Sequence, residues 1–182
     1  MIISMCAGEF VHVDLMPIND NAPEHSVVCT SYIGENFSLS LATKQAYNDK
    51  DCVALCIELT EEEHQKLTSY LLALADHNIP YNYQDVLVSA LPRSVSRVLV
   101  DDVADERPEK ISTLFCSQAV VLALRNSLDG SHPLMHTLQQ VNSRCTLPDT
   151  LFRLLEPGCQ RLSCQALRSG VASAIITTPP AS

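Results

Sequence analysis

The sequence has little positive charge and no basic cluster. Its 182 residues include 12 lysines and arginines against 21 aspartates and glutamates, which gives a formal net charge of −9. Nucleic acids and anionic membrane surfaces bind proteins through basic patches. We therefore expect neither of them to be a primary partner of this chain.

Long apolar runs are also missing. No apolar stretch approaches the length of a membrane-spanning helix. Residues 1–10 lack the basic start and the long apolar core of a secretory signal peptide, and the chain contains no internal repeat or low-complexity segment. These absences predict a soluble, cytoplasmic protein with no membrane span.

Cysteine and histidine do not occur at the spacings of a metal site. The pairs His25/Cys29 and Cys52/Cys56 each lack a second half at zinc-site spacing, so we expect no metal and no other cofactor. The eight cysteines lie mostly in apolar runs of a chain that is long enough to fold without disulfides. We expect a reducing, intracellular environment in which most of them are small buried side chains.

The chain does contain enough apolar material for one core. Hydrophobic residues make up 46% of it, which at this length predicts one domain rather than two. We place that domain at residues 1–165 and expect residues 166–182 to form a flexible tail. Within the tail, residues 171–176 could dock as an edge strand.

Alternating apolar residues predict a sheet in the first third of the chain. Strands are expected at residues 9–16, 26–33, 37–41 and 52–59, and the second and third form a hairpin. In the first strand His12 and Asp14 share one face, while Val13 and Leu15 share the other.

Helices are expected further along the chain. Thr60 followed by three glutamates supplies the cap and the first-turn acids of an amphipathic helix that ends near His77. A second helix is predicted from Cys116, and a third is specified by Pro148 in its first turn. The structure of residues 86–91 is left open, and the charged residues 92–110 are expected to form a surface segment or short helices.

Cys116, at the start of the second predicted helix, is the candidate nucleophile. A thiol there lies at the positive end of the helix dipole, beside N–H groups that have no intrahelical partner. Both features favour the thiolate, which is the reactive form. Such a nucleophile needs a base and a third group that orients the base. His12 is the candidate base and Asp14 the candidate orienting residue, with His25 and Glu35 as alternatives for the latter.

Three segments, residues 11–15, 115–120 and 146–152, carry a resemblance to a known family. They read Val-His-Val-Asp-Leu, Phe-Cys-Ser-Gln-Ala-Val and Thr-Leu-Pro-Asp-Thr-Leu-Phe. They are similar to the His-Val-Glu-Leu strand, the Phe-Cys-Ser-Glu helix start and the Ser-Pro-Asn/Asp-Asp-Leu-Tyr helix start of the circularly permuted papain-like fold of the NlpC-like superfamily. Asp14 and Gln118 each replace a glutamate of that pattern, and Thr150 replaces an acid.

The resemblance covers roughly residues 9–155 and implies a fold and a site. The superfamily includes bacterial and viral cysteine peptidases and amidases, and relatives of lecithin retinol acyltransferase. It implies an α+β domain in which a small antiparallel sheet or half-barrel packs against helices. It also implies that the histidine precedes the cysteine in the chain, as His12 precedes Cys116 here.

The site that follows has one oxyanion donor assigned and one open. The Cys116 backbone N–H would be the first donor. Tyr81 and Tyr83 are candidates for the second donor or for substrate binding, and Gln118 is a further candidate for substrate binding.

Three functions are compatible with these residues. The first is cleavage of an amide or isopeptide bond in a protein or peptide-like substrate through a thioester at Cys116. The second is acyl transfer or thioester hydrolysis on acyl substrates, as in relatives with the same permuted order. The third is a catalytically inactive domain used for binding or assembly. The Glu-to-Gln change at Gln118 and the unassigned second oxyanion donor support this third function.

Overall fold

The computed structural model describes residues 2–6, 13–16, 27–30, 35–41, 52–89, 99–103 and 105–163. The strands are β1 (Ile2–Cys6), β2 (Val13–Met16), β3 (Val27–Thr30), β4 (Ser38–Leu41), β5 (Cys52–Cys56) and β6 (Gln160–Ser163). The α-helices are α1 (Glu61–Asp76), α2 (Tyr83–Ser89), α4 (Cys116–Ser127), α5 (Met135–Gln139) and α6 (Pro148–Leu155). Short 3-10 helices lie at η3 (Pro108–Lys110), η4 (Ser143–Cys145) and η5 (Glu156–Gly158).

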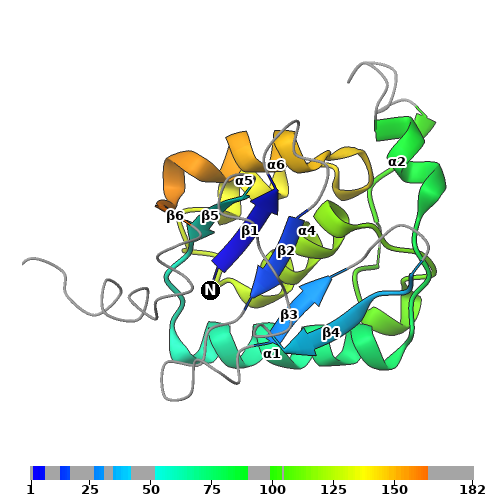
Figure 1. Ribbon diagram of the computed structural model, residues 1–182, viewed down its shortest axis with the longest axis horizontal. Helices are drawn as coiled ribbons and strands as arrows, with labels where there is room; N and C mark the ends of the chain where they lie inside the picture. The colour runs from blue at the N-terminus through cyan, green and yellow to red at the C-terminus, as the bar shows by residue number, and fades with distance from the viewer. Residues whose placement is uncertain are drawn as a thin grey trace, which may run out of the picture.

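The six strands form one antiparallel sheet (Figure 1). Its strand order is β4-β3-β2-β1-β5-β6. The interior strand β1 lies between β2 and β5, so Ile3 pairs with Leu15 on one side and with Leu55 on the other. The predicted hairpin is present as the pair β3 and β4.

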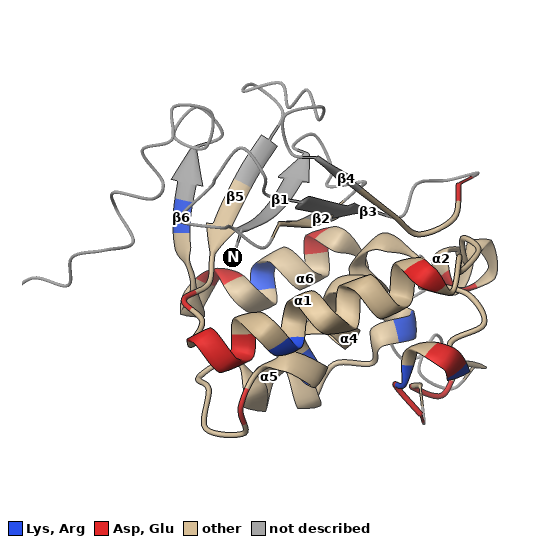
Figure 2. Cartoon of the chain, turned by 90° about the horizontal axis from the view of Figure 1, so that it is seen from below, with Lys and Arg blue, Asp and Glu red and all other residues tan. Residues whose placement is uncertain are grey.

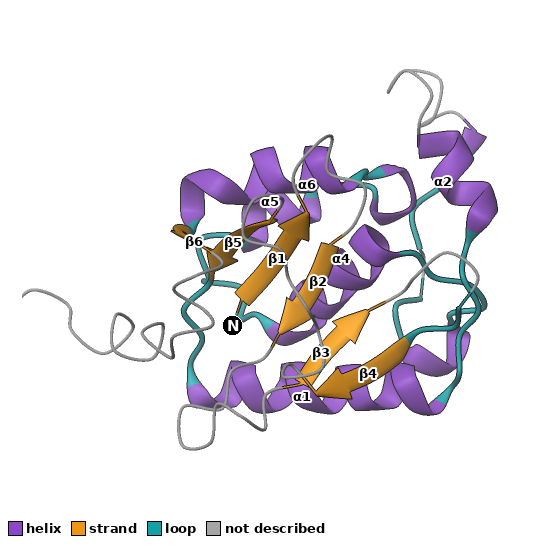
Figure 3. Ribbon diagram, in the orientation of Figure 1, coloured by secondary structure: helices purple, strands orange, loops and turns teal. Residues whose placement is uncertain are grey.

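The helices lie together on one face of this sheet (Figures 2 and 3). α4 is the innermost of them, because it contacts β2 as well as α1, α5 and α6. Every side chain of α4 from Cys116 to Leu124 is buried. A helix that is apolar around its whole circumference belongs to the interior of a domain, and α4 therefore forms the centre of the helical layer.

One core joins the sheet to the helices. Val13, Leu15 and Leu55 of the sheet belong to the same buried cluster as Leu67 of α1 and Leu122 of α4. Each fully buried side chain of this size contributes about 2 kcal/mol of transfer free energy. The core thus fixes β2 against α4.

The start of α1 is sealed by a capping box, as the sequence predicts. The hydroxyl of Thr60 accepts a hydrogen bond from the Glu63 N–H at 3.2 Å, and the Glu63 carboxylate accepts one from the Thr60 N–H at 2.9 Å. Two of the N–H groups that a helix start leaves open are thereby satisfied. The buried stripe of Leu67, Tyr70, Leu71 and Leu74 lies below this cap.

Most of the described elements match the predictions, and the misses are short. The helices at 61–76, 116–127 and 148–155 are confirmed, and the open segment 86–91 lies partly in α2. The strands β1 and β6 were not predicted. Both are short, and β6 is held mainly by its pairing with β5, a contact distant in sequence.

The fold is mixed α+β, with an antiparallel sheet covered by helices on one face. Residues 164–182 lie outside the described part of the chain, so the predicted tail and the edge strand at 171–176 stay predictions. In the described residues no helix is both long and apolar enough to cross a membrane.

Candidate functional site

Cys116 is the first residue of α4, as predicted. The residue before it, Phe115, is extended, with φ −123° and ψ 168°, and contributes no side-chain cap. The first turn carries no acid, and the first hydrogen bond of the helix runs from the Ala119 N–H to the Phe115 carbonyl at 2.9 Å. Unlike α1, this helix therefore starts without a side-chain cap from any residue in the described ranges, and its first N–H groups lie at the residue that carries the thiol. The Cys116 side chain is only 3% exposed.

Two of the three segments that resemble the family, residues 115–120 and 146–152, contact each other. The hydroxyl of Ser117 donates a hydrogen bond to the Thr146 carbonyl at 2.6 Å, and Ser117 is completely buried. The hydroxyl of Thr146 in turn donates to the Asn142 carbonyl at 2.6 Å. The start of the Cys116 helix is thus tied to the residues that lead into α6.

Of the third segment that resembles the family, residues 11–15, the structure describes the part that lies in β2. His12 lies outside the described residues, but β2, which begins at the next residue, packs against α4. In Figure 1 both elements begin toward the same end of the molecule. Val13 and Leu15 are the β2 side chains that enter the shared core.

The candidate orienting residues are less well placed. The Asp14 backbone pairs with Ser4 of β1, while its side chain and the whole of His25 lie outside the described part. Glu35 is exposed, and its neighbour Asn36 donates a hydrogen bond to the Asn78 side chain at 2.9 Å, near the end of α1. None of the three has a described contact with Cys116.

The segment 80–82 runs beside the approach to Cys116. Tyr81 forms a parallel bridge with Leu114. The Leu114 N–H donates to the Pro80 carbonyl at 3.0 Å, and the Asn82 N–H donates to the Leu114 carbonyl at 3.0 Å. These two hydrogen bonds fix Tyr81 next to the residues that lead into α4.

Tyr81 is coupled to the thiol electrostatically. Burial, the charge of a Cys116 thiolate and the charge of Tyr83 together raise the pKa of Tyr81 to about 12. The ring of Tyr83 meets that of Tyr81 edge to face, with centroids 5.1 Å apart and an interplanar angle of 65°. Tyr83 itself is 52% exposed, so the structure brings Tyr81 toward the site and leaves Tyr83 at its rim.

Gln118 lies on the first turn of α4 and carries an unusual atom. Its side chain is 2% exposed, and within the described part of the chain its Oε1 has no hydrogen-bond partner. A buried acceptor without a partner costs about 1–3 kcal/mol. Such a group is retained where a ligand or a water completes its hydrogen bonding.

A buried ion pair holds α2 against η4. Arg144 donates to both oxygens of Asp85, through Nε at 2.6 Å and Nη2 at 3.0 Å. Asp85 is 1% exposed and also accepts from the Asn82 side chain at 2.7 Å. A bidentate arginine–carboxylate pair fixes orientation as well as distance, so the segment that carries Tyr81 has a rigid base.

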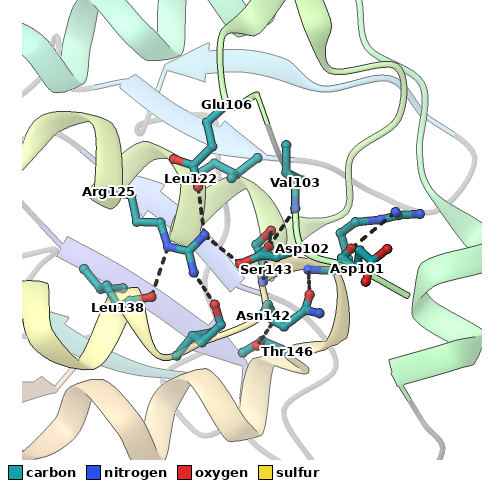
Figure 4. A network of polar contacts seen from close by, with 12 residues as sticks. Asp101, Asp102, Val103, Glu106, Leu122, Arg125, Leu138, Asn142, Ser143 and Thr146 are labelled. Carbon is teal, nitrogen blue, oxygen red and sulfur yellow. Dashed lines mark hydrogen bonds and ion pairs between the residues drawn. The ribbon is translucent and has the colours of Figure 1, made fainter. Parts of the chain in front are cut away.

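The other end of α4 is held by Arg125 (Figure 4). Its Nη1 bridges Asp102 at 2.9 Å and Glu106 at 2.8 Å, and its Nε donates to the Leu138 carbonyl at 3.0 Å. Its Nη2 donates to the Val141 carbonyl. The guanidinium is 10% exposed and has an acceptor for each of its nitrogens.

Asp102 completes this network. The backbone N–H and the hydroxyl of Ser143 donate to its Oδ1 at 2.9 and 2.7 Å. Burial alone would raise the pKa of the Asp102 carboxyl, but the Ser143 hydrogen bonds and the Arg125 charge outweigh burial and hold the pKa below its ordinary value. The segment around Asp102 is therefore anchored to the body of the domain.

These anchoring residues were not among those predicted from the sequence. The available signal was an arginine at the end of an apolar helix, together with an acidic run at 101–106. Such an arginine needs partners when it is buried. Asp85 and Arg144 gave no comparable signal, because neither stands in a recognisable pattern.

No group of three or more His, Cys, Asp or Glu side chains among the described residues is arranged to hold a metal ion. Comparisons with protein-family models, with curated proteins and with solved structures found no match to this chain.

Proposed function

We propose that this protein is a cysteine-dependent hydrolase that cleaves an amide or isopeptide bond, with Cys116 as nucleophile and His12 as base, on a permuted papain-like fold. The observation that carries the proposal is the position of Cys116 as first residue of α4, a helix that has no side-chain cap and packs against β2, the strand that follows His12. Open N–H groups at a helix start stabilise the negative charge that develops on the carbonyl oxygen when the sulfur attacks.

The order of the family-like segments in space supports the same proposal. Ser117 hydrogen-bonds Thr146, and β2 packs on α4, so all three segments converge on one helix. Contact of these three segments with one helix is what the proposed permuted papain-like fold requires.

The reaction proceeds in two balanced halves. His12 takes the Cys116 proton, the sulfur attacks the carbonyl carbon, and the tetrahedral intermediate collapses to a thioester as the leaving amine receives the proton from His12. Water then attacks the thioester with His12 as base, which releases the acid and restores the thiol. The Cys116 backbone N–H donates to the oxyanion in both halves. Asp14 is the proposed orienting residue for His12.

The proposal makes a structural demand on β2. Val13 and Leu15 already fill the side of the strand that packs on α4, and side chains alternate along a regular strand. The dyad therefore requires that this alternation does not extend back through His12. If Asp14 follows the alternation, it lies on the opposite face from a His12 that meets Cys116, and the orienting role falls to His25 or Glu35.

An inactive binding domain is the second candidate, and one observation favours it. Cys116 is 3% exposed, as a purely structural thiol would be. The two candidates differ in whether Cys116 forms a covalent intermediate.

Acyl-enzyme trapping decides between them. The protein is mixed with a peptide p-nitrophenyl ester or a fatty-acyl p-nitrophenyl ester, quenched in acid, and analysed by peptide mass spectrometry. We expect the peptide acyl group on Cys116, and its loss in His12→Ala but not in the control variant Cys145→Ser. A preference for the fatty-acyl probe would move the assignment to acyl transfer. No acylation of Cys116 by either probe would leave the inactive domain.

A further inference from the structure

Two buried or half-buried tyrosines of this domain use their hydroxyl groups differently. The Tyr70 hydroxyl donates to the Glu106 carbonyl at 2.6 Å. The hydroxyl of the half-buried Tyr81 makes no hydrogen bond to any residue in the described ranges. It is also not among the buried side-chain atoms that lack a partner, so this hydroxyl reaches solvent and can donate to a ligand.

Tyr81 stands on the Cys116 side of the domain because of backbone pairing. Its bridge with Leu114 places it beside the residue two positions before the thiol. The hydrogen bonds from Leu114 to Pro80 and from Asn82 to Leu114 close this pairing on both sides of Tyr81. One parallel bridge and two backbone hydrogen bonds therefore fix this segment beside Leu114.

Side chains also fix the segment that carries Tyr81. The Asn82 side chain accepts from the Asp85 N–H at 3.0 Å, and Asp85 carries the two hydrogen bonds from Arg144. Tyr83 packs edge to face on the ring of Tyr81. A donor that is fixed before the substrate arrives stabilises a developing charge without reorganisation.

The chemistry of this phenol suits a hydrogen-bond donor. Burial comes first among the causes that raise the pKa of Tyr81 to about 12, followed by the charges of Cys116 and Tyr83. The phenol therefore keeps its proton across the neutral range.

We infer that the Tyr81 hydroxyl is the second oxyanion donor, acting beside the Cys116 backbone N–H. This inference rests on the proposed function. When the sulfur attacks, the carbonyl π electrons move to oxygen, and that oxygen accepts hydrogen bonds from both donors. No proton leaves Tyr81, and the carbonyl re-forms when the bond to the leaving group breaks. Tyr81 is then a catalytic residue.

Two reactions of the same thiol test this role. Alkylation by iodoacetamide displaces iodide from a saturated carbon and forms no oxyanion, whereas acylation by a peptide p-nitrophenyl ester passes through one. Both rates are measured at Cys116 by mass spectrometry in the wild type, in Tyr81→Phe and in the matched control Tyr70→Phe. Tyr81→Phe keeps the ring and removes only the hydroxyl.

We expect Tyr81→Phe to slow acylation by about 100-fold, the usual effect of losing one oxyanion donor, and to leave alkylation within about 2-fold. Tyr70→Phe should leave both rates near the wild-type values, because its hydroxyl donates to the Glu106 carbonyl and has no part in the reaction. Unchanged acylation in Tyr81→Phe, or an equal fall in both reactions, would overturn the inference while the proposed function stands. Failure of the wild type to acylate would overturn both.

Discussion

The two ends of α4 are built in opposite ways. At the C-terminal end the Arg125 guanidinium is saturated by two carboxylates and two carbonyls. At the N-terminal end Phe115 offers no side-chain cap, and in the described part of the chain Gln118 Oε1 has no partner. At the C-terminal end every guanidinium nitrogen has an acceptor. At the N-terminal end N–H donors and one acceptor have no partner among the described residues.

The difference assigns separate tasks to the two ends. A saturated, partly buried charge network fixes position and has little left to offer a ligand. Open N–H groups at a helix start attract a negative charge, as the thiolate and the oxyanion of the proposed reaction are. Substitutions at the N-terminal end should therefore affect the acylation rate, and substitutions at the C-terminal end the free energy of unfolding. A variant that changes the wrong quantity would refute this division.

The largest effect is expected at the open end. Cys116→Ser should lower the acylation rate by at least about 10⁴-fold, because the nucleophile is lost. The free energy of unfolding should change by less than about 1 kcal/mol, since the side chains have similar volume. Peptide-ester turnover and urea unfolding measure the two quantities. Cys145→Ser is the matched control, and equal losses of activity in the two variants would contradict the assignment.

At the saturated end the expected loss is in stability. Arg125→Met leaves Asp102 and Glu106 without their shared cation, which should lower the free energy of unfolding by about 3 kcal/mol. The control is Arg153→Met. Arg153 is 76% exposed in its pair with Asp149, and its removal should cost no more than about 0.5 kcal/mol. Similar unfolding curves for both variants would show that the Arg125 network does not stabilise the fold.

The same network predicts how stability depends on pH. Because the pKa of Asp102 is lower in the folded protein than in the unfolded chain, its contribution is complete above about pH 4 and is lost as the pH falls through the folded-state value. The wild type should therefore lose more stability below about pH 4 than Asp102→Asn does. Urea unfolding at several pH values from neutral to acid measures the two slopes. Parallel slopes would remove Asp102 from the acid-sensitive groups.

The smallest effects are expected inside the first turn of α4. Ser117→Ala removes the hydrogen bond to Thr146 and should lower the free energy of unfolding by about 1 kcal/mol. Gln118→Met removes an acceptor that has no described partner, and should be neutral or slightly stabilising. Thermal unfolding of the two variants side by side measures this contrast. A larger loss in Gln118→Met than in Ser117→Ala would show that the Gln118 amide is part of the structure rather than of the open site.

The sequence predicted where α4 begins, but not the contacts that α4 makes with the rest of the domain. Cys116 at a helix start follows from local signals, namely the apolar run and the polar residues before it. The contacts of Ser117 with Thr146, of Arg125 with Asp102 and of Tyr81 with Leu114 join residues that are distant in the chain. Nothing in local propensity specifies such pairs, because they depend on how the layers pack.

The missed strands have the same explanation. β1 is a short apolar run without alternation, and β6 is polar and becomes a strand through its pairing with β5. β-propensity depends strongly on neighbours of this kind. The predicted pairing of His12 with Cys116 also depends on packing, and it stays a prediction because His12 lies outside the described residues.

Competition among the cysteines tests the central claim most directly. Native protein is treated with a limiting amount of iodoacetamide at pH 7, and the labelled thiols are mapped by mass spectrometry. Exposure alone favours Cys145, which is partly exposed, over Cys116 at 3%. Cys159 should react slowly, because burial and the charge of Cys56 raise its pKa to about 12. The account predicts that Cys116 is labelled first and that His12→Ala removes this preference. Labelling of Cys145 first, with Cys116 reacting only in denaturant, would contradict it.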